Sequence, residues 1–422
     1  MRILVVTRLF SGFTDSVRER RWQPRGAPAI ARLFEGLAAS GHDLDIVLTA
    51  KEPLADGLGN RSERLHLQGF APEIRLLAGV GLWPAWLGRL RWYLNEARQS
   101  LLVLLLVWSR RPAVVYVDRG NLWAAAFTAW LSPASVVYRV MGITENLTLS
   151  LSGRGPQARI TRFLRRAPLR MAICTLDGSG GEVWLKRLFR ADVEQHVLMN
   201  GVDRPTASAA LPFALPAGRT VVGLIGRLDE LKASDRFLEA FLLARTRRPG
   251  ELFALIVGDG ALEEQMRERV REAGAGEDVL FAGSLAHNVI STVHGRCDIY
   301  VSLNRQGNLS NANLEALLHG ACVIFPRSDR ETGRDMATDD LLPDDVVWRV
   351  ENSDAVEEIA EAIVALHDAP GDRERRGRRT AEIASRFATW DERVAREIQL
   401  IETAADPASR RPTDLKNVLE QE

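Results

Sequence analysis

Two series of short apolar runs, separated by stretches with helical periodicity, constrain the fold of this chain most strongly. The first series comprises residues 2–6, 43–49, 113–117, 135–140, 170–175 and 195–200, and the second comprises residues 220–226, 252–258, 279–283, 298–303 and 321–326. Strands that are apolar throughout must be buried on both faces, as in a parallel sheet covered by helices on each side. The sequence therefore predicts an α/β fold of two doubly wound parallel-sheet domains facing a cleft, since such sheets bind ligands at the carboxyl ends of their strands.

The domain boundaries follow from the stretch rich in alanine and proline that separates the two series. We expect an N-terminal Rossmann-like domain over residues 1–200 and a C-terminal one over residues 201–387. Residues 388–403 are helical in period, and the polar segment 404–422 is expected to be a tail.

Composition and charge exclude several classes of protein. Lys+Arg and Asp+Glu both total 55 of 422 residues, which gives no indication of a nucleic-acid partner. The three cysteines, Cys174, Cys297 and Cys322, lie in or beside apolar runs without metal-ligand spacing, so we expect reduced, buried thiols. The chain starts directly with a strand pattern and not with a signal-peptide layout, which favours the cytoplasm.

The stretch "GRLDELKASDRFLEAF" (226–241) is the most informative strand end of the second series. Arg227 and Lys232 follow the strand and precede a helix, where two fixed cations could neutralise a departing diphosphate. An ordinary solvated loop that contains one arginine and one lysine explains the same letters.

The stretch "RQGNLSNANLEALLHG" (305–320) lies between two buried strands. The backbone amides of Asn308, Leu309, Ser310 and Asn311 at its helix start form a natural anion site. Glu315 follows one turn later on the same helix face, where a carboxylate can accept hydrogen bonds from the vicinal hydroxyls of a ribose. The alternative is a polar helix cap followed by a solvent-facing glutamate.

These motifs, in this order, resemble the retaining glycosyltransferases of family four, which have the GT-B fold. The resemblance rests on "GRLDELK", "LIVGDG", "VLFAGSL" and "NLSNANLEALLHGACVI", preceded by "LAASGHDLDIVLT" (37–49) and "NGVD" (200–203), and it covers almost the whole chain. It implies metal-independent transfer of a sugar, with retention, from a UDP- or GDP-sugar to a glycan, lipid-linked or small-molecule acceptor. It also implies a role in the synthesis of cell-surface or secreted glycans, and final helices that cross back to the first domain.

The resemblance assigns roles to individual residues. Arg227 and Lys232 would contact the donor diphosphate, Glu315 would hold the ribose, and the backbone of Gly283, Ser284 and Leu285 would lie near the base. No cofactor or metal is implied.

The first domain has fewer signals. Gly26 stands where the family has a glycine-rich turn close to the donor phosphates, and Asp118 ends a strand, where it could contact an acceptor hydroxyl. A helix cap is an equally good interpretation of Asp118.

One position departs from the family pattern. Gly307 stands where the family has a glutamate that contacts the donor sugar, and Asn308 follows where glycine is usual. We expect an active enzyme with a variant sugar pocket, in which Gly307→Glu would change donor preference. The alternatives are a non-catalytic GT-B subunit that binds a nucleotide sugar, and a GT-B sugar-nucleotide epimerase.

Two stretches raise the question of membrane contact. Residues 82–111 and 159–170 mix arginine with leucine and aromatic residues, as in an interfacial helix near a lipid-linked acceptor. The longest charge-free run in the first stretch, "QSLLVLLLVWS", is shorter than the ~20 residues that span a bilayer. A peripheral position at the inner face of the membrane is thus one expectation, and a buried helix with solvated arginines is the other.

Overall fold

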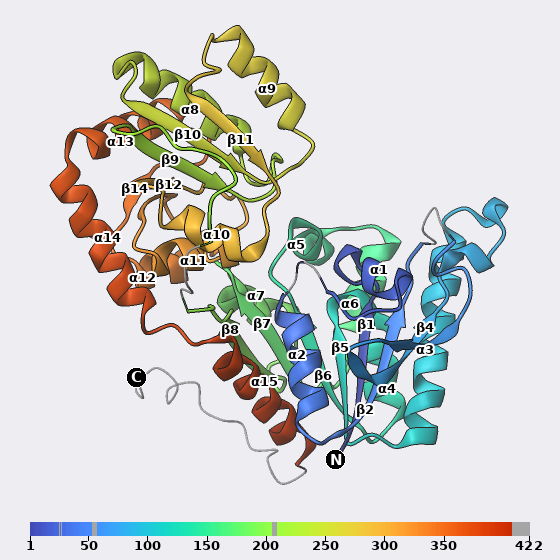
Figure 1. The fold of residues 1–422 in the computed structure, drawn as a ribbon. Coiled ribbons are helices and arrows are strands. Elements are labelled where there is room, and N and C mark those ends of the chain that lie inside the picture. The colour runs from blue at the N-terminus through green and yellow to red at the C-terminus, as the bar shows by residue number, and fades with distance from the viewer. Residues whose placement is uncertain (25, 27, 53–56, 205–208, 407–422) are drawn as a thin grey trace. The chain divides into compact units, whose positions relative to one another are not determined.

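The structure is a computed structural model that describes residues 1–24, 26, 28–52, 57–204 and 209–406 (Figure 1). Its contacts divide the chain into two compact units. Of the described residues, unit 1 contains those in Met1–Thr175 and Gly181–Leu198 and residues 390–406, and unit 2 contains those in Leu176–Gly180 and Met199–Thr389. The predicted tail lies outside the described residues from position 407 onward. Each unit is built on one mainly parallel sheet, which confirms the predicted fold class.

Unit 1 is built on an eight-stranded sheet of order β3-β4-β2-β1-β5-β6-β7-β8, in which β3 is antiparallel to β4. Its strands are β1 (Arg2–Arg8), β2 (Asp43–Thr49), β3 (Glu63–Leu67), β4 (Phe70–Leu77), β5 (Val114–Asp118), β6 (Ser135–Val140), β7 (Met171–Leu176) and β8 (Glu194–Met199). Its helices are α1 (Ser11–Arg18), α2 (Pro28–Ala39), α3 (Leu90–Arg110), α4 (Leu122–Leu131), α5 (Glu145–Ser152), α6 (Pro156–Leu164), α7 (Gly181–Leu188) and α15 (Trp390–Ala405), with 3-10 turns η1 (Val80–Leu82), η2 (Ala85–Leu87) and η3 (Arg119–Asn121).

Alternating side chains of the strands in unit 1 build two cores. Ile3 and Val5 of β1 pack with residues of α2 and α15 on one face, whereas Leu4 and Val6 pack with residues of α3 and α4 on the other. Because successive side chains of a strand point to opposite faces, a strand covered on both sides must be apolar at every position.

Helix α15 returns to unit 1, as predicted for the final helices. Glu397 on this helix is buried, accepts a hydrogen bond from the Tyr116 hydroxyl (2.6 Å) and lies 3.1 Å from Nε of Arg139. Burial alone would raise the pKa of Glu397, but Arg139 and Arg393 outweigh it, so the pKa is lowered and the carboxylate stays charged. The hydrogen bond from Tyr116 links the helix to β5, and the buried ion pair with Arg139 links it to β6.

Unit 2 is built on a six-stranded sheet of order β11-β10-β9-β12-β13-β14, in which every pair is parallel. Its strands are β9 (Thr220–Ile225), β10 (Leu252–Val257), β11 (Val279–Gly283), β12 (Ile299–Val301), β13 (Cys322–Pro326) and β14 (Trp348–Val350). Its helices are α8 (Ser234–Arg247), α9 (Glu263–Glu272), α10 (His287–His294), α11 (Asn311–Leu318), α12 (Met336–Leu341), α13 (Val356–Asp368) and α14 (Pro370–Ala384).

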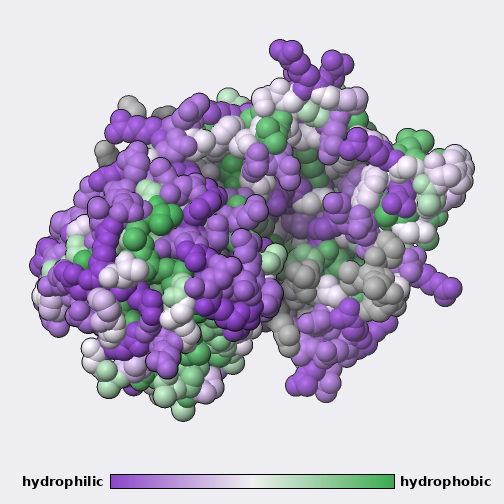
Figure 2. Space-filling view, turned by 90° about the horizontal axis from the view of Figure 1, so that it is seen from above, coloured by the Kyte–Doolittle hydropathy of each residue, from purple (hydrophilic) through white to green (hydrophobic). Residues whose placement is uncertain are grey.

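The sheet of unit 2 is also covered on both faces. One core contains residues of α8, α9 and α13, and cores on the other side contain residues of α10, α11 and α14. On the face of the molecule shown in Figure 2, hydrophilic residues predominate and hydrophobic ones lie among them.

Candidate functional site

The loops at the carboxyl ends of β9, β12 and β13 lie side by side because these strands are neighbours in a parallel sheet. The contact is direct, since the Arg305 N–H donates to the Leu231 carbonyl (2.9 Å) and Arg305 Nε donates to the Glu230 carbonyl (3.1 Å). The loop that carries Lys232 and the loop that leads into α11 therefore form one surface, as the sequence predicts.

Lys232 is the most enclosed cation of this surface. Its backbone N–H donates to Asp229 Oδ1 (2.9 Å), and Arg227 lies 3.3 Å from the other oxygen of Asp229. Burial and the nearby Arg227 lower the pKa of Lys232, while Asp229 and Asp177 oppose the shift. In the part of the chain that the structure describes, no hydrogen bond or ion pair of the Lys232 ammonium is found. The Arg227 side chain is 67% exposed, so of the two predicted cations Lys232 is the more enclosed.

Glycines allow the loops after β9 and β10 to pack backbone against backbone. A Cβ atom on Gly258 would lie 1.9 Å from the Gly226 carbonyl oxygen, and one on Gly260 would lie 2.3 Å from the Leu228 carbonyl oxygen. Only glycine fits such an approach. The glycines of the "GRL" and "GDG" motifs are therefore explained by the close backbone contact between these two loops.

The start of α11 differs from the expectation that all four amides from Asn308 to Asn311 are available to an anion. The Asn308 N–H donates to Asp335 Oδ1 (2.7 Å), and the Leu309 N–H donates to the Asp177 carbonyl (3.1 Å). Both amides are thus used within the protein, and for these two positions the expectation is wrong in this structure.

The next two backbone amides of α11 differ from these in their hydrogen bonding. No acceptor for the N–H groups of Ser310 and Asn311 is found among the described residues. Ser310 Oγ and Asn200 Oδ1 are buried without a hydrogen-bond partner there, while Asn200 Nδ2 donates to Asn311 Oδ1 (2.7 Å). Buried polar groups are normally paired, so this cluster at a helix N-terminus is suited to an anionic ligand.

Gly307 does not line an open sugar pocket. Its φ is +144°, and a Cβ atom there would lie 2.3 Å from the backbone carbon of Gly178 and 2.6 Å from the Asp177 carbonyl oxygen. Gly178 is equally constrained, because a Cβ atom there would lie 2.6 Å from the Asn308 nitrogen. Residues 176–181, "LDGSGG", therefore occupy the space into which a side chain at position 307 would point. This contradicts the expectation that Gly307→Glu would alter donor preference.

The asparagines of the "NLSNAN" motif mainly build a buried network. Asn308 Nδ2 donates to Asp335 Oδ2 (2.8 Å), and Asn308 Oδ1 accepts from Ser302 Oγ (2.9 Å). Asn313 accepts a hydrogen bond from the Tyr300 hydroxyl (3.0 Å). Burial raises the pKa of Asp335 although Asn308 and Thr338 donate to it. These residues fix the loop before α11, and Asp335 was not singled out from the sequence.

Glu315 lies on the second turn of α11 beside an unusual histidine. Its Oε2 is 3.7 Å from Nε2 of His294, which is buried, and no hydrogen-bond partner of either His294 ring nitrogen is found among the described residues. Burial, assisted by His319 and His287, lowers the pKa of His294 to about 3, so the imidazole is neutral. Burial likewise raises the pKa of Glu315; Asp203 adds to this effect, while His287 opposes it.

The Glu315 carboxylate has oxygens that can accept hydrogen bonds from a ligand. Within the described ranges no hydrogen bond to its oxygens is found, and the rings of Tyr300 and His319 flank His294 at 5.6 and 6.0 Å. A half-buried carboxylate against this wall can accept hydrogen bonds from hydroxyl groups.

The three remaining predicted residues of this unit lie at the end of β11 and directly after it. The Gly283 carbonyl accepts from the Gly258 N–H (2.9 Å), Ser284 Oγ donates to Asp259 Oδ2 (2.7 Å), and Leu285 packs on the apolar cluster below. This backbone leads directly into α10, which packs against α11.

The two predicted residues of unit 1 are placed as follows. Asp118 Oδ2 accepts from Thr7 Oγ1 (2.5 Å) and from the Arg8 N–H (2.8 Å), and its Oδ1 accepts from Asn121 Nδ2 (2.8 Å). These bonds tie the ends of β1 and β5 together and favour a structural role for Asp118. Gly26 is exposed and has a φ of +62°, a value that favours glycine.

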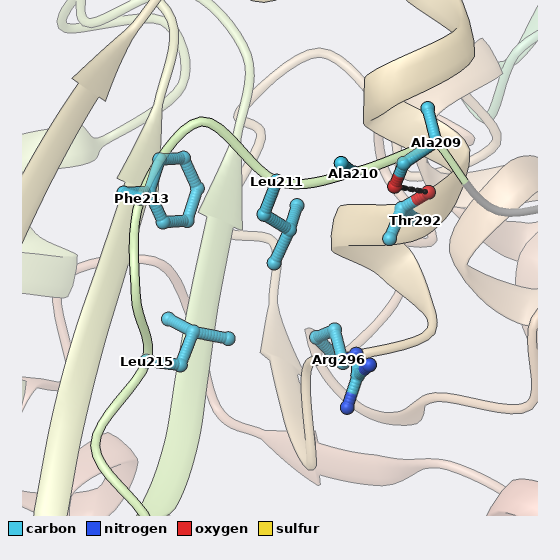
Figure 3. Close-up of a pocket in the computed structure, with 7 residues that line it drawn as sticks. All are labelled: Ala209, Ala210, Leu211, Phe213, Leu215, Thr292 and Arg296. Carbon is cyan, nitrogen blue, oxygen red and sulfur yellow. Dashed lines mark hydrogen bonds between the residues drawn. The ribbon is translucent and has the colours of Figure 1, made fainter.

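A pocket in unit 2 lies elsewhere. Figure 3 shows it between α10 and the segment that precedes β9, with Thr292 Oγ1 donating to the Ala209 carbonyl (3.0 Å). It is lined by Ala209, Ala210, Leu211, Phe213, Leu215, Thr292 and Arg296. None of the predicted site residues lines it, and its walls lack the carboxylate that a ribose site needs.

Metal ligands do not cluster in the described part of the chain: no three histidine, cysteine, aspartate or glutamate side chains there are placed to hold an ion together. The cysteines Cys174, Cys297 and Cys322 are buried free thiols.

Part of the chain is similar to known glycosyltransferases. Residues 219–369 match the family model "Glycosyl transferases group 1". The chain is 31% identical over 290 residues to the 2-deoxystreptamine N-acetyl-D-glucosaminyltransferase of Streptomyces fradiae, covering 63% of this chain and 64% of that protein. It thus spans less than two thirds of the length of this relative.

Solved structures show the same fold. Sucrose-phosphate synthase from Thermosynechococcus elongatus is similar with a TM-score of 0.69 at 15% identity, over 95% of this chain and 98% of that one. HepE from Anabaena, solved in complex with UDP, is similar with a TM-score of 0.66 at 16% identity, over 96% and 100%. The fold is therefore that of GT-B glycosyltransferases.

Proposed function

We propose that this protein transfers a glycosyl residue from a nucleoside diphosphate sugar to an acceptor hydroxyl. One observation carries the proposal: the loop of Lys232 contacts the loop that leads into α11, and this helix has two free amides at its start and a carboxylate, Glu315, on its second turn. The two amides, of Ser310 and Asn311, have no acceptor among the described residues, and all these groups lie inside the segment that matches group 1 glycosyl transferases. A cation, a helix N-terminus and a hydroxyl-accepting carboxylate are the groups that a diphosphate attached to a ribose requires.

Each part of the site has a separate task in this proposal. Lys232, assisted by Arg227, neutralises the charge that grows on the diphosphate as it leaves, and the amides of Ser310 and Asn311 donate to its oxygens. Glu315 holds the ribose hydroxyls, and the backbone of Gly283–Leu285 contacts the base.

The reaction follows from these groups without an enzymic nucleophile. The bond between the anomeric carbon and the diphosphate oxygen breaks, the acceptor oxygen bonds to that carbon from the same face, and the acceptor proton moves to the leaving diphosphate. The anomeric configuration is retained. In this scheme Lys232 and Arg227 supply the positive charge at the diphosphate, so we propose that transfer is metal-independent.

The names of similar proteins suggest which donor to test first. HepE was solved with UDP, and the Streptomyces relative is named for N-acetylglucosaminyl transfer to 2-deoxystreptamine. We therefore propose a UDP-sugar, beginning with UDP-N-acetylglucosamine, and a glycan, lipid-linked or small polyhydroxylated acceptor at the cytoplasmic side. GDP-sugars are the second choice.

The experiment is a panel of UDP-, GDP- and ADP-sugars incubated with the full chain, with and without chelator. Release of free nucleoside diphosphate by slow hydrolysis, undiminished by the chelator, is the expected result. Binding without any turnover would identify a non-catalytic nucleotide-sugar subunit, and conversion of the donor into a different nucleotide sugar would identify an epimerase; either would overturn the proposal.

Glu315→Gln is expected to weaken binding of the preferred nucleotide sugar at least tenfold, because a ribose hydroxyl bonded to a charged group contributes about 1.5–3 kcal/mol. Isothermal titration measures the effect. Glu382→Gln on α14, whose side chain is 62% exposed, is the matched control. Equal affinity of both variants would remove Glu315 from the site.

Binding is expected to weaken as the pH falls. Because the pKa of Glu315 is raised, its carboxylate, the form that accepts both ribose hydrogen bonds, is lost at a higher pH than that of an ordinary glutamate. The facing groups are His294, which stays neutral, together with His287, Asp203 and His319. Titrations across the acidic range should show this decline in the wild type and a flatter profile in Glu315→Gln; identical profiles would contradict it.

A further inference from the structure

The exposed large apolar side chains of this protein are concentrated in one part of unit 1. Of the eleven on the described surface, nine lie between residues 82 and 163, namely Leu82, Trp86, Leu90, Leu101, Leu105, Trp108, Leu131, Leu149 and Phe163. Trp86 is 82% exposed and Phe163 is 60% exposed. Single exposed hydrophobic residues are ordinary, but several that lie together in space mark an interaction surface.

The outward side of α3 shows the pattern most clearly. Leu101, Leu105 and Trp108 are spaced by four and three residues, so they form one stripe, and each is about half exposed. The inward side of the same helix includes the buried polar residues Asn95 and Gln99. A surface helix of a soluble domain normally has polar residues on its outer stripe.

Side-chain contacts join this stripe to the neighbouring helices. Trp108 Nε1 donates to the Leu131 carbonyl at the end of α4 (3.1 Å), and the rings of Trp130 and Phe163 lie 5.1 Å apart, linking α4 to α6. Arg162 donates to carbonyls at the end of α5. The carboxyl-terminal ends of α3 and α4 thus form one surface with α5 and α6, which we call the apolar-basic face. Its exposed apolar side chains are Leu101, Leu105, Trp108, Leu131, Leu149 and Phe163.

The charge of this region is strongly one-sided. Residues 89–170 contain thirteen arginines, no lysine and three acidic residues, whereas charges balance at 55 against 55 over the whole chain. In the described structure no hydrogen bond or ion pair is found for the guanidinium groups of five exposed arginines, Arg89, Arg111, Arg154, Arg159 and Arg166. In unit 2, by contrast, arginines of α8 and α9, and the one that directly follows α8, each lie against a carboxylate: Arg245, Arg247, Arg248, Arg267, Arg269 and Arg271.

We propose that the apolar-basic face docks onto an anionic lipid surface. Leucine and aromatic side chains enter the boundary between headgroups and acyl chains while the unpaired arginines meet lipid phosphates, which is how interfacial helices bind. The helices lie on the surface and do not cross it, since no described helix is long and apolar enough to span a bilayer. This inference is independent of the proposed donor site.

The test is flotation of the full chain with vesicles. We expect binding to vesicles of phosphatidylcholine that contain phosphatidylglycerol, weaker binding to phosphatidylcholine alone, and release by high salt. Leu105→Glu should lower the partition coefficient at least tenfold, and Arg159→Glu about fivefold or more, because each arginine near an anionic surface contributes about that factor.

Matched controls come from unit 2. Met336→Glu removes an exposed apolar side chain and Arg378→Glu reverses an exposed arginine, so both should bind vesicles like the wild type. Absence of wild-type binding to anionic vesicles, or equal losses in the control variants, would overturn the proposal. So would sedimentation showing a wild-type dimer that Leu105→Glu dissociates without any vesicle binding, since the face would then join two copies of the chain.

Discussion

Replacing Lys232 by alanine is expected to slow glycosyl transfer by about a hundredfold or more, because loss of one preorganised donor to a developing charge raises the barrier by about 3 kcal/mol. The lysine is well suited to this part. It is enclosed by the loop after β9, lies near Asp177 and Asp229, and has no hydrogen-bond acceptor for its ammonium among the described residues. A charged group held in this way needs little reorganisation when the diphosphate leaves.

Steady-state kinetics with the preferred donor measure the effect, and Lys186→Ala on α7 serves as the control. The loss should appear mainly in kcat, since the interaction strengthens as charge develops on the leaving group. Arg227→Ala should lose less, because its side chain is 67% exposed and already lies beside Asp229. Wild-type kcat in Lys232→Ala would show that the diphosphate does not bind at this loop.

Gly307→Glu is expected to destabilise unit 2 severely and not to retune donor choice. A side chain at this position meets the backbone of Gly178 at 2.3 Å, and the φ of +144° is a conformation that residues with a Cβ atom rarely adopt. Strain of this kind and overpacking each contribute about 1–3 kcal/mol, so we expect a loss of about 2–6 kcal/mol.

Urea denaturation measures this loss. Gly276→Glu is the control, because nothing lies within 4 Å of a Cβ atom there and the residue is exposed. If Gly307→Glu were as stable as the wild type and bound a different sugar, the close backbone contact between Gly307 and Gly178 would be disproved. The sequence-based expectation that position 307 lines the sugar pocket would then be correct.

The strands of both units could be predicted because their residues are apolar at every position. Each of the eleven apolar runs is a strand in the structure, and most of these strands begin or end one or two residues away from the predicted position. The strands β3, β4 and β14 were missed. "ERLHL" and "FAPEIRLL" alternate or mix polar and apolar residues, as strands at or next to a sheet edge with one wetter face do. The three residues of β14 are too few to show a period.

The candidate site was predicted in part. Lys232 and Glu315 could be singled out because a strand end or a helix start lies next to them in sequence. Asp335 and His294 could not, since their importance depends on contacts across the sheet edge, with Asn308 at 2.8 Å and with Glu315 at 3.7 Å. The availability of single amides at α11 also depends on which neighbouring carbonyls and carboxylates reach them.

The apolar-basic face, too, could be predicted from the sequence only in part. The excess of arginine over residues 89–170 can be read directly from the sequence, but a leucine-rich helix can be buried or exposed. Only the structure shows that Leu101, Leu105 and Trp108 point outward. It also shows that five exposed arginines of this region have no carboxylate partner among the described residues, namely Arg89, Arg111, Arg154, Arg159 and Arg166.

The most direct measurement is a crystal structure of the protein with a bound UDP-sugar. The diphosphate should lie within hydrogen-bond distance of Lys232 and of the Ser310 and Asn311 amides, with the ribose hydroxyls on Glu315. A nucleotide bound elsewhere, for example in the pocket beside Thr292 and Arg296, with the Glu315 carboxylate left in water, would contradict the proposed site.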